Sequence, residues 1–346
     1  MAISNSIKPT TLLKAMTVWP DSMIESDFAA HFETLRAIQR EQTARIMLTA
    51  TLPDYSAVNI VWLNQCGITV DDCVDNECDF TGPNVSSYVQ AGTIDQCKMS
   101  KTSVPIDAWR NNIYGQEDAE AMNLIRTMQR HVEYIARYAV GVINANLGVN
   151  THTPVGSGWT GQGTTNTTIP ANAATETGTY GYLMRNAERN LLEDPYILTG
   201  EALAHMNYLA RTNQGNLDGR GDALRADTFR LYEDAWNIDA VNAPALMFYL
   251  IQRGALAFAS DAYFPRVNGP NQLGNAEVLD GNYTRFSIPN RFFPALVHDV
   301  ERMVSCTSGV WAVNYRVKSR YKVFVNPLGC TATQTGLLGF TVESGV

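Results

Sequence analysis

Apolar residues recur every three or four positions along one long stretch without proline, from Gln116 to about Asn146. The recurring positions are Ile125, Met128, Val132, Ile135, Ala139 and Val142. This spacing predicts an α-helix with one apolar side. At about 1.5 Å per residue, the helix would be roughly 45 Å long, and we expect it to support other elements of the fold. The charged side chains off this stripe should face water or a neighbour: Arg126, Arg130, Glu133 and Arg137.

A second long pattern lies near the end of the chain and has a period of two. Its apolar positions are Trp311, Val313, Tyr315, Val317, Tyr321, Val323 and Val325. The period predicts a β-strand with one apolar face. The other face is basic and carries Arg316, Lys318, Arg320 and Lys322. At about 3.3 Å per residue, the strand would be close to 50 Å long, so we expect it to lie on the long helix.

The first hundred residues predict an arm, a helix and a hairpin. Residues 1 to 19 show no periodic signal, and a capping box at Ser22 then predicts a helix that continues to about Leu48. Two β-prone runs follow, Val58 to Leu63 and Lys98 to Ile106, with a long turn-rich segment between them. We expect these two runs to pair as a hairpin with little core of its own.

The middle of the chain predicts a flexible loop followed by a compact α/β unit. Residues 148 to 179 are rich in Gly, Thr and Asn and predict the loop. Helices are expected at Tyr182–Leu192 and Gly200–Arg211, with a turn at Asn213–Gly221. The apolar segment Ala245–Ser260 is expected to be buried in a sheet and broken at Gly254. Cys330 to Phe340 should add a last turn and a short apolar piece.

Composition and charge limit the possible functions. The 346 residues are 45% hydrophobic and 17% charged, which is typical of a globular protein able to build a core. The formal net charge of −8 argues against tight, sequence-specific nucleic-acid binding. The N-terminus lacks a secretory signal pattern, and the longest apolar run, Ala243 to Leu250, is far shorter than a membrane span. We therefore expect a soluble protein made in a cytoplasm, with no membrane partner.

Candidate catalytic and metal-binding residues form no recognised motif. The five histidines are scattered, at His31, His131, His152, His205 and His298, and no two are four residues apart. The clustered cysteines Cys66, Cys73, Cys78 and Cys97 lack the spacing of a zinc site, and buried or free thiols are the expected alternative. The acidic run after Thr69 lacks the order of a calcium loop, and the glycines fit no phosphate-binding loop. The sequence predicts no enzyme, metal or cofactor, although residues distant in sequence could still converge in space.

The order of these parts resembles one known family. An arm, a long hairpin, a long helix, a glycine-rich loop, a compact α/β unit and a long returning strand occur in that order over nearly the whole chain. This order is similar to that of the major capsid proteins of tailed bacteriophages, the Hong Kong 97-like fold. Three local stretches also look like that family: Glu193-Asp194-Pro195-Tyr196-Ile197-Leu198, Gln252-Arg253-Gly254-Ala255, and Phe324-Val325-Asn326-Pro327 leading to Gly336-Leu337-Leu338.

The resemblance implies an α+β fold divided into four parts. Residues 1–53 would be the N-terminal arm and helix, and 54–113 the E-loop hairpin. Residues 114–179 and 296–346 would form the peripheral domain, with the long spine helix and a long-stranded sheet, and 180–295 the axial domain. The implied function is structural: pentamers and hexamers would assemble in the host bacterial cytoplasm into an icosahedral virion capsid around double-stranded DNA held without sequence preference. A portal and a separate scaffold protein would be the partners.

Two other functions are alternatives to this one. The shell of a bacterial encapsulating nanocompartment resembles the same fold but would enclose cargo proteins, and such shells tend to lack a long hairpin excursion. A solitary binding module explains poorly why so much of the chain is predicted as arms with little core.

Charge suggests how subunits contact each other. Residues 54 to 107 contain eight acidic residues and two lysines, a net charge of −6. In the family that the chain resembles, the hairpin reaches over a neighbour's peripheral domain, which would contain the basic strand. The candidate intersubunit contacts are therefore Asp71, Asp72, Asp75, Glu77 and Asp79 on the hairpin, and Arg316, Lys318, Arg320 and Lys322 on the strand. The alternative is that both sets are only solvated, since exposed ion pairs contribute just about 0–1 kcal/mol.

Overall fold

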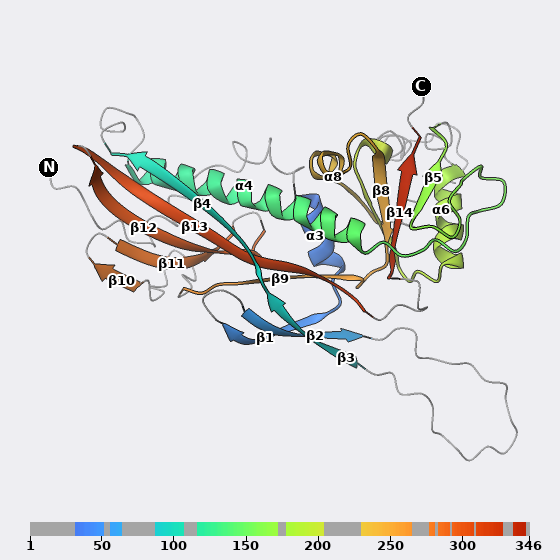
Figure 1. Ribbon diagram of the computed structural model, residues 1–346, viewed down its shortest axis with the longest axis horizontal. Helices are drawn as coiled ribbons and strands as arrows, with labels where there is room; N and C mark the ends of the chain where they lie inside the picture. Colours follow the sequence, from blue (N-terminus) through green and yellow to red (C-terminus); the bar gives the residue numbers. More distant parts are fainter. Residues whose placement is uncertain are drawn as a thin grey trace, which may run out of the picture.

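The computed structural model is elongated, with a long helix lying along a sheet of long strands (Figure 1). A second sheet lies at one end of the helix, and a small three-stranded sheet lies on the other side of the long strands. The structure describes residues 32–51, 56–63, 87–106, 116–171, 178–203, 230–264, 277–280, 283–290, 293–307, 309–327 and 335–343.

The long helix predicted from periodicity is confirmed as α4, Gln116–Ala145, which is 30 residues long. The apolar stripe is buried from Ile125 to Ala139, and Val142 is partly buried against the same core. Arg126 and Arg130 are exposed, as expected. Glu133 does not face water: its side chain is 9% exposed and accepts a hydrogen bond from Arg130 at 3.0 Å.

The sheet beneath α4 is built around β13, Val310–Val325, a strand of 16 residues that confirms the predicted long strand. Its strand order is β10 (Glu277–Asp280), β11 (Tyr283–Pro289), β12 (Val297–Thr307), β13 and β4 (Gln96–Pro105). Strand β9 (Leu256–Asp261) pairs with the C-terminal part of β13, from Arg320 to Val325. All of these pairings are antiparallel. Val313, Tyr315 and Val317 pack in one cluster with the first half of α4, which confirms that the long strand lies on the long helix.

The second sheet is packed between helices. Its strand order is β5 (Asn166–Ile169), β14 (Leu337–Val342), β8 (Leu246–Ile251), β6 (Tyr196–Thr199) and β7 (Arg230–Glu233). Alternate residues of β8 face opposite ways. Phe248 and Leu250 join the core that contains α6, Gly178–Arg189, whereas Tyr249 and Ile251 join the core shared by α4 and α8, Ala235–Asn242. This alternation explains why the whole segment is apolar, as a strand buried on both faces must be.

The break at Gly254 is confirmed, but the two strands that it separates lie in different sheets. Gly254 has φ +77°, and a Cβ there would lie 2.2 Å from Oγ1 of Thr43. Glycine is therefore needed both for the left-handed backbone and for the close approach of the chain. The turn sends β8 into the five-stranded sheet and β9 to the edge of β13.

Two predictions for the N-terminal part are wrong. The helix does not continue to Leu48: in the described residues it is α3, Glu33–Glu41, and Arg45–Thr51 is strand β1. The hairpin partner is also different. Strand β2, Ser56–Leu63, pairs with β3, Ser87–Ile94, and the segment expected to pair with it, β4, pairs with β13 instead. The physical reason is that β4 finds a long uncovered edge on β13, whereas β1, β2 and β3 form their own small sheet over Phe324.

The glycine-rich stretch is more ordered than predicted. Strand β5 lies within it, and Asn150, near its start, is 1% exposed. Asn150 donates to Thr167 at 2.6 Å and accepts from Asn190 at 2.9 Å, which ties the loop to α6. The prediction of a flexible loop is therefore wrong for residues 148–171. Of the expected helix at Gly200–Arg211, the described part is the 3-10 turn η2, Glu201–Leu203.

Sheet membership crosses the domain boundaries expected from the sequence. Strands β9, β10 and β11 come from residues assigned to the axial domain, yet they pair into the sheet of β13. Strand β14 comes from residues assigned to the peripheral domain, yet it lies within the five-stranded sheet, between β5 and β8. The four-part division itself stays a prediction. The turn expected at Asn213–Gly221 lies outside the described residues.

Candidate intersubunit surface

The four basic residues of β13 lie on the face of the sheet that points away from α4. Their even positions alternate with Val313, Tyr315 and Val317, which pack toward the helix. They differ strongly in exposure, however. Arg316 and Lys318 have side chains 43% and 36% exposed, Lys322 is 27% exposed, and Arg320 is only 3% exposed. Arg320 therefore lies on the basic face but is buried within it.

Glu301 on β12 is the acidic centre of this face. It lies directly beside Arg316 in the strand register, and one of its oxygens accepts hydrogen bonds from Arg316 and from the Tyr283 hydroxyl, the latter at 2.9 Å. Its other oxygen lies 3.4 Å from Nζ of Lys318. Burial alone would raise the pKa of Glu301, but the hydrogen bonds from Arg316 and Tyr283 outweigh it and hold the pKa below its ordinary value.

Arg320 is held inside the protein. Its Nη2 lies 3.6 Å from Asp299, and its guanidinium lies over the ring of Tyr263. Asp299 in turn accepts hydrogen bonds from the Tyr263 backbone N–H at 3.0 Å and the Ser287 hydroxyl at 2.5 Å. Arg320 and Asp299 therefore fasten the segment after β9 to β12 and β13, a structural role within one chain.

Lys322 contacts an acidic residue of its own chain. Its Nζ donates to Asp95 at 2.9 Å, in the short link between β3 and β4. Partial burial would raise the pKa of Asp95, but the hydrogen bonds from Lys322 and Gln96 lower it below the ordinary value. Asp95 belongs to the acidic region from 54 to 107, so one pair between that region and the basic strand is formed within the chain. Asp71, Asp72, Asp75, Glu77 and Asp79 lie outside the described residues.

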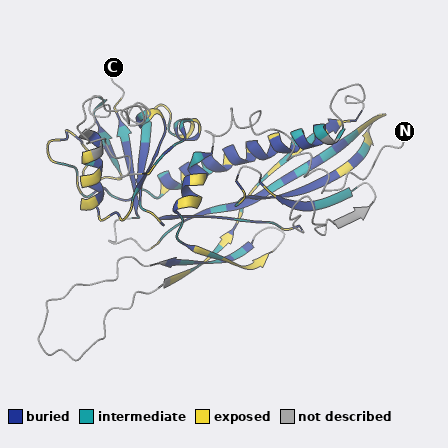
Figure 2. Cartoon of the chain, turned by 180° about the vertical axis from the view of Figure 1, so that it is seen from behind, coloured by how far each residue is buried: buried dark blue, intermediate teal, exposed yellow. Residues whose placement is uncertain are grey.

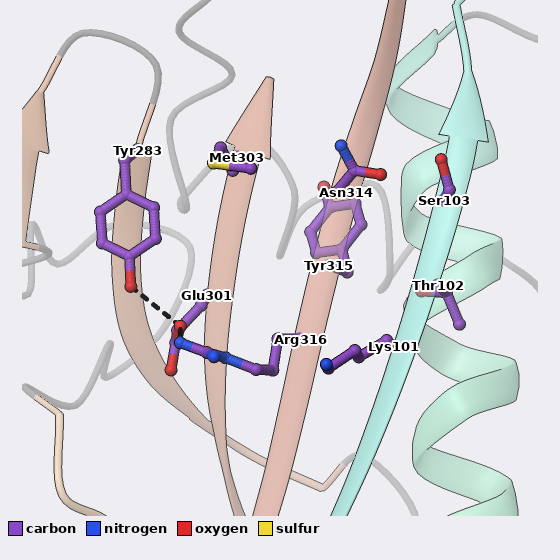
Figure 3. Close-up of a pocket in the computed structure, with 9 residues that line it drawn as sticks. All are labelled: Lys101, Thr102, Ser103, Tyr283, Glu301, Met303, Asn314, Tyr315 and Arg316. Carbon is purple, nitrogen blue, oxygen red and sulfur yellow. Dashed lines mark hydrogen bonds and ion pairs between the residues drawn. The ribbon is translucent and has the colours of Figure 1, made fainter. Parts of the chain in front are cut away.

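A hollow of about 440 Å³ opens on the same face of the sheet, across β4, β13, β12 and β11 (Figure 3). Tyr283 and the Arg316 guanidinium converge on Glu301 within it, and Lys101 lies on the neighbouring strand beside Arg316. The residues that give it its chemistry are Lys101, Ser103, Tyr283, Glu301, Met303 and Arg316. Sequence reasoning missed the hollow, because β4 was expected to pair elsewhere.

The three-stranded sheet exposes apolar side chains. Its inner face has a small core in which Val58, Ile60 and Trp62 pack on β9 and Phe324. On the opposite face, Met47 is 48% exposed and Val89 54%, and at the rims of the inner face, beside Val58 and Trp62 in the register, Leu48 is 49% exposed and Tyr88 45%. Figure 2 shows this exposure on β1 and β3, in contrast to the buried strands above. We name this set of four side chains the arm patch.

Two histidines distant in sequence meet in a buried chain of hydrogen bonds. Ser319 Oγ lies 2.6 Å from Nδ1 of His131 and 2.7 Å from Nδ1 of His298. The other ring nitrogens contact Ser100 and Asn290 at 2.8 and 2.9 Å. Because Oδ1 of Asn290 accepts the Phe293 backbone N–H, its amide nitrogen must donate to His298. The chain is then satisfied when both histidines are neutral.

Burial lowers the pKa of His131 to about 4 and that of His298 well below its ordinary value. His131 is packed, at 3% exposed. The pair fastens α4 to β4, β12 and β13 through hydrogen bonds with Ser100, Ser319 and Asn290. His31 and His205 lie outside the described residues, and His152 is exposed.

The described residues contain no group of three or more His, Cys, Asp or Glu side chains placed to hold a metal ion. Cys97 and Cys306 are free thiols and exposed, and Cys66, Cys73 and Cys78 lie outside the described residues. Within the described part of the chain, no helix combines the length and the apolar character needed to cross a membrane.

No protein-family profile and no curated protein matches the chain. Solved structures do match. One described as Mycobacterium phage Cain is 12% identical, with a TM-score of 0.40, over 95% of this chain and 95% of that chain. The asymmetric unit of the bacteriophage PhiM1 mature capsid is 8% identical, with a TM-score of 0.37, over 85% and 83%. The Cyanophage Pam1 capsid asymmetric unit is 10% identical, with a TM-score of 0.40, over 83% and 84%.

Phage capsid structures are thus among those to which the chain is similar. All three TM-scores are below 0.5, so the similarity does not by itself establish what the chain does.

Proposed function

We propose that the chain is the major capsid protein of a tailed bacteriophage, a structural protein and not an enzyme. Copies assemble as pentamers and hexamers into an icosahedral shell that encloses double-stranded DNA. Assembly takes place in the host bacterial cytoplasm with a portal and a separate scaffold protein.

One observation carries the proposal: the same chain combines a well-packed body with an arm that exposes apolar side chains. The body is α4 packed on the sheet of β13, and two buried hydrophobic clusters lie between them. The arm is the sheet of β1, β2 and β3, whose core is a single small cluster and whose arm patch is exposed. Large exposed apolar patches mark protein–protein contact sites, so contact with another copy is the simplest way to bury these side chains.

We further propose that the acidic residues Asp71, Asp72, Asp75, Glu77 and Asp79 contact the basic strand of a neighbouring copy. The contacts within one chain limit which basic residues of β13 could contact those acidic residues. Arg320 is buried with Asp299, and Lys322 is 27% exposed and paired with Asp95. Arg316 and Lys318 also contact an acid of their own chain, Glu301, but at 43% and 36% they are the most exposed members of the set.

The arm patch gives a direct test. Changing Met47 and Val89 together to Lys should abolish particle formation while leaving the circular dichroism spectrum of the folded chain unchanged. Val155→Lys is the matched control, because Val155 is 97% exposed and lies in a turn outside the sheet of β1, β2 and β3. Particles that form equally well with the doubly substituted arm would contradict the proposal.

The contents of the particles test the second half of the proposal. Particles purified from infected or packaging-competent cells should protect genome-length DNA from added nuclease. Particles that hold cargo proteins and no protected DNA would instead indicate a nanocompartment shell.

A further inference from the structure

The hollow on the outward face of the sheet has more positive charge than its own carboxylate can neutralise. Lys101 and Arg316 are direct partners in the register of β4 and β13. Like charges directly opposite each other on adjacent strands destabilise a sheet. Lys101 is exposed and makes no ion pair with any described residue. An anion between these two side chains would therefore remove a repulsion and add an attraction.

Glu301 is not the anion that lies between Lys101 and Arg316. One of its oxygens already accepts from Arg316 and Tyr283, and the other lies 3.4 Å from Lys318. In addition, the Nε–H of Arg316 is buried and has no hydrogen-bond partner among the described residues. A buried donor without a partner costs roughly 1–3 kcal/mol, so Glu301 does not satisfy the whole Arg316 guanidinium.

The surroundings of the two cations favour a protein ligand over a nucleic acid. Met303, in the hollow, is 44% exposed, and Met99, on the same face beside Lys318, is 50% exposed. Met, Tyr and Arg are the residue types enriched at the centres of protein–protein interfaces. A DNA backbone presents a continuous row of phosphates, and such a row would have to pass the Glu301 carboxylate, which repels it.

We propose that the hollow formed by Lys101, Arg316, Met303 and Tyr283 binds an aspartate or glutamate side chain of a second copy of the chain. The carboxylate lies between the Lys101 ammonium and the Arg316 guanidinium, and its methylene group packs on Met303. This inference rests on the proposed function, because it requires copies to associate. The net charge of −8 means that each copy has more carboxylates than cations to pair with them. The exposed methionines would surround the ion pair with apolar contacts that exclude water.

Charge reversal of Lys101 tests the site with little risk to the fold, since Lys101 is exposed. Self-association of the purified full chain is followed by sedimentation velocity across a range of concentrations. Lys101→Glu should raise the concentration needed for association at least about tenfold, equivalent to about 1.4 kcal/mol per contact. Lys101→Arg should retain association. Arg126→Glu makes the same charge change at an exposed position on α4 and should have little effect.

A second variant places a carboxylate of the same chain in the hollow. Met303→Glu places an acidic side chain in the hollow, where it should neutralise the cations and block the second copy, so it should weaken association as Lys101→Glu does. Association unchanged by both variants would overturn the site while leaving the proposed function intact. A wild-type chain that stays monomeric at all concentrations would overturn both.

Two further measurements identify other occupants. Glutarate, a small dicarboxylate, should compete weakly with self-association when added in millimolar amounts. If it instead binds the hollow tightly without affecting association, the site belongs to a small anion and the inference is wrong. If Lys101→Glu weakens DNA binding in a filter assay but leaves association unchanged, the hollow is a nucleic-acid contact and the inference is also wrong.

Discussion

Arg302 on β12 and Glu120 on α4 form a buried ion pair, with Nε of the arginine 2.9 Å from Oε2 of the glutamate. Their side chains are 3% and 0% exposed. The Tyr315 hydroxyl, on β13, donates to the same carboxylate oxygen. The first half of the long helix is thus joined to two central strands by charge as well as by apolar packing.

Removing one member of this pair should destabilise the protein strongly. Glu120→Ala leaves a buried guanidinium without its carboxylate, and we expect a loss of about 3–5 kcal/mol in the free energy of unfolding, measured by urea denaturation. The exposed control Arg126→Ala should change it by less than about 0.5 kcal/mol. Replacing both members, Glu120→Leu with Arg302→Met, should recover much of the loss. A loss below 1 kcal/mol for Glu120→Ala would contradict the structural role.

The buried histidines predict a specific acid sensitivity. The folded-state pKa of His131 is lowered to about 4, so the unfolded chain binds its proton first as pH falls. The contribution of neutral His131 is fully present above pH 6.5 and is lost progressively between pH 6.5 and about 4. Since one pKa unit corresponds to about 1.4 kcal/mol, the loss is on the order of 3 kcal/mol.

His131→Gln isolates that contribution. The difference in free energy of unfolding between the wild type and His131→Gln should shrink as pH falls from 7 to 4. His152→Gln, at an exposed loop position, should follow the wild type at every pH. If the wild-type and His131→Gln curves stay parallel from pH 7 to 4, the histidine is not held neutral in the folded protein.

The charge pairing between copies can be tested by exchange. Lys318→Glu should weaken assembly, because it removes an accessible cation and places a second carboxylate beside Glu301. Adding Asp72→Lys and Asp75→Lys to the same chain should partly restore it. Arg320 is unsuitable for this exchange, because reversing a buried charge would disturb the fold. Normal particle yield from Lys318→Glu alone, measured by sedimentation, would rule the pairing out.

DNA should bind to the chain weakly and without sequence preference. With a net charge of −8 and no basic, aromatic-lined groove expected from the sequence, we expect dissociation constants of about 10⁻⁴–10⁻⁶ M at physiological salt, weakening steeply as salt rises. Filter binding with two unrelated duplexes of equal length checks this. Nanomolar affinity for one duplex alone would require a means of reading bases that the proposal lacks.

The elements with a long, regular period could be predicted from the sequence. Helix α4 and strand β13 each repeat one pattern over many residues, and their matched lengths also predicted their contact. Short segments were less certain because their patterns fit two structures. Arg45–Thr51 continues an apolar spacing compatible with a helix, yet its strand form allows it to pair with β2. Hydrophobic pattern alone does not say which edge a strand will join, so the partner of β4 was missed.

The candidate surface was less predictable, for a physical reason. A basic strand face is visible in the sequence, but the acids that meet it come from other strands. Glu301, Asp299 and Asp95 are placed opposite Arg316, Arg320 and Lys322 by the fold alone. The contact of His131 with His298 also joins residues far apart in the chain, so no spacing rule could predict it.

The central claim, that copies of this chain build a closed shell, is tested most directly by cryo-electron microscopy of particles from cells that express the full chain with its scaffold. We predict closed icosahedral particles built from clusters of five and six copies, in which the sheet of β1, β2 and β3 of each copy rests on its neighbour and the arm patch is covered. A chain recovered as a monomer, or particles in which that patch faces solvent in every copy, would contradict the account.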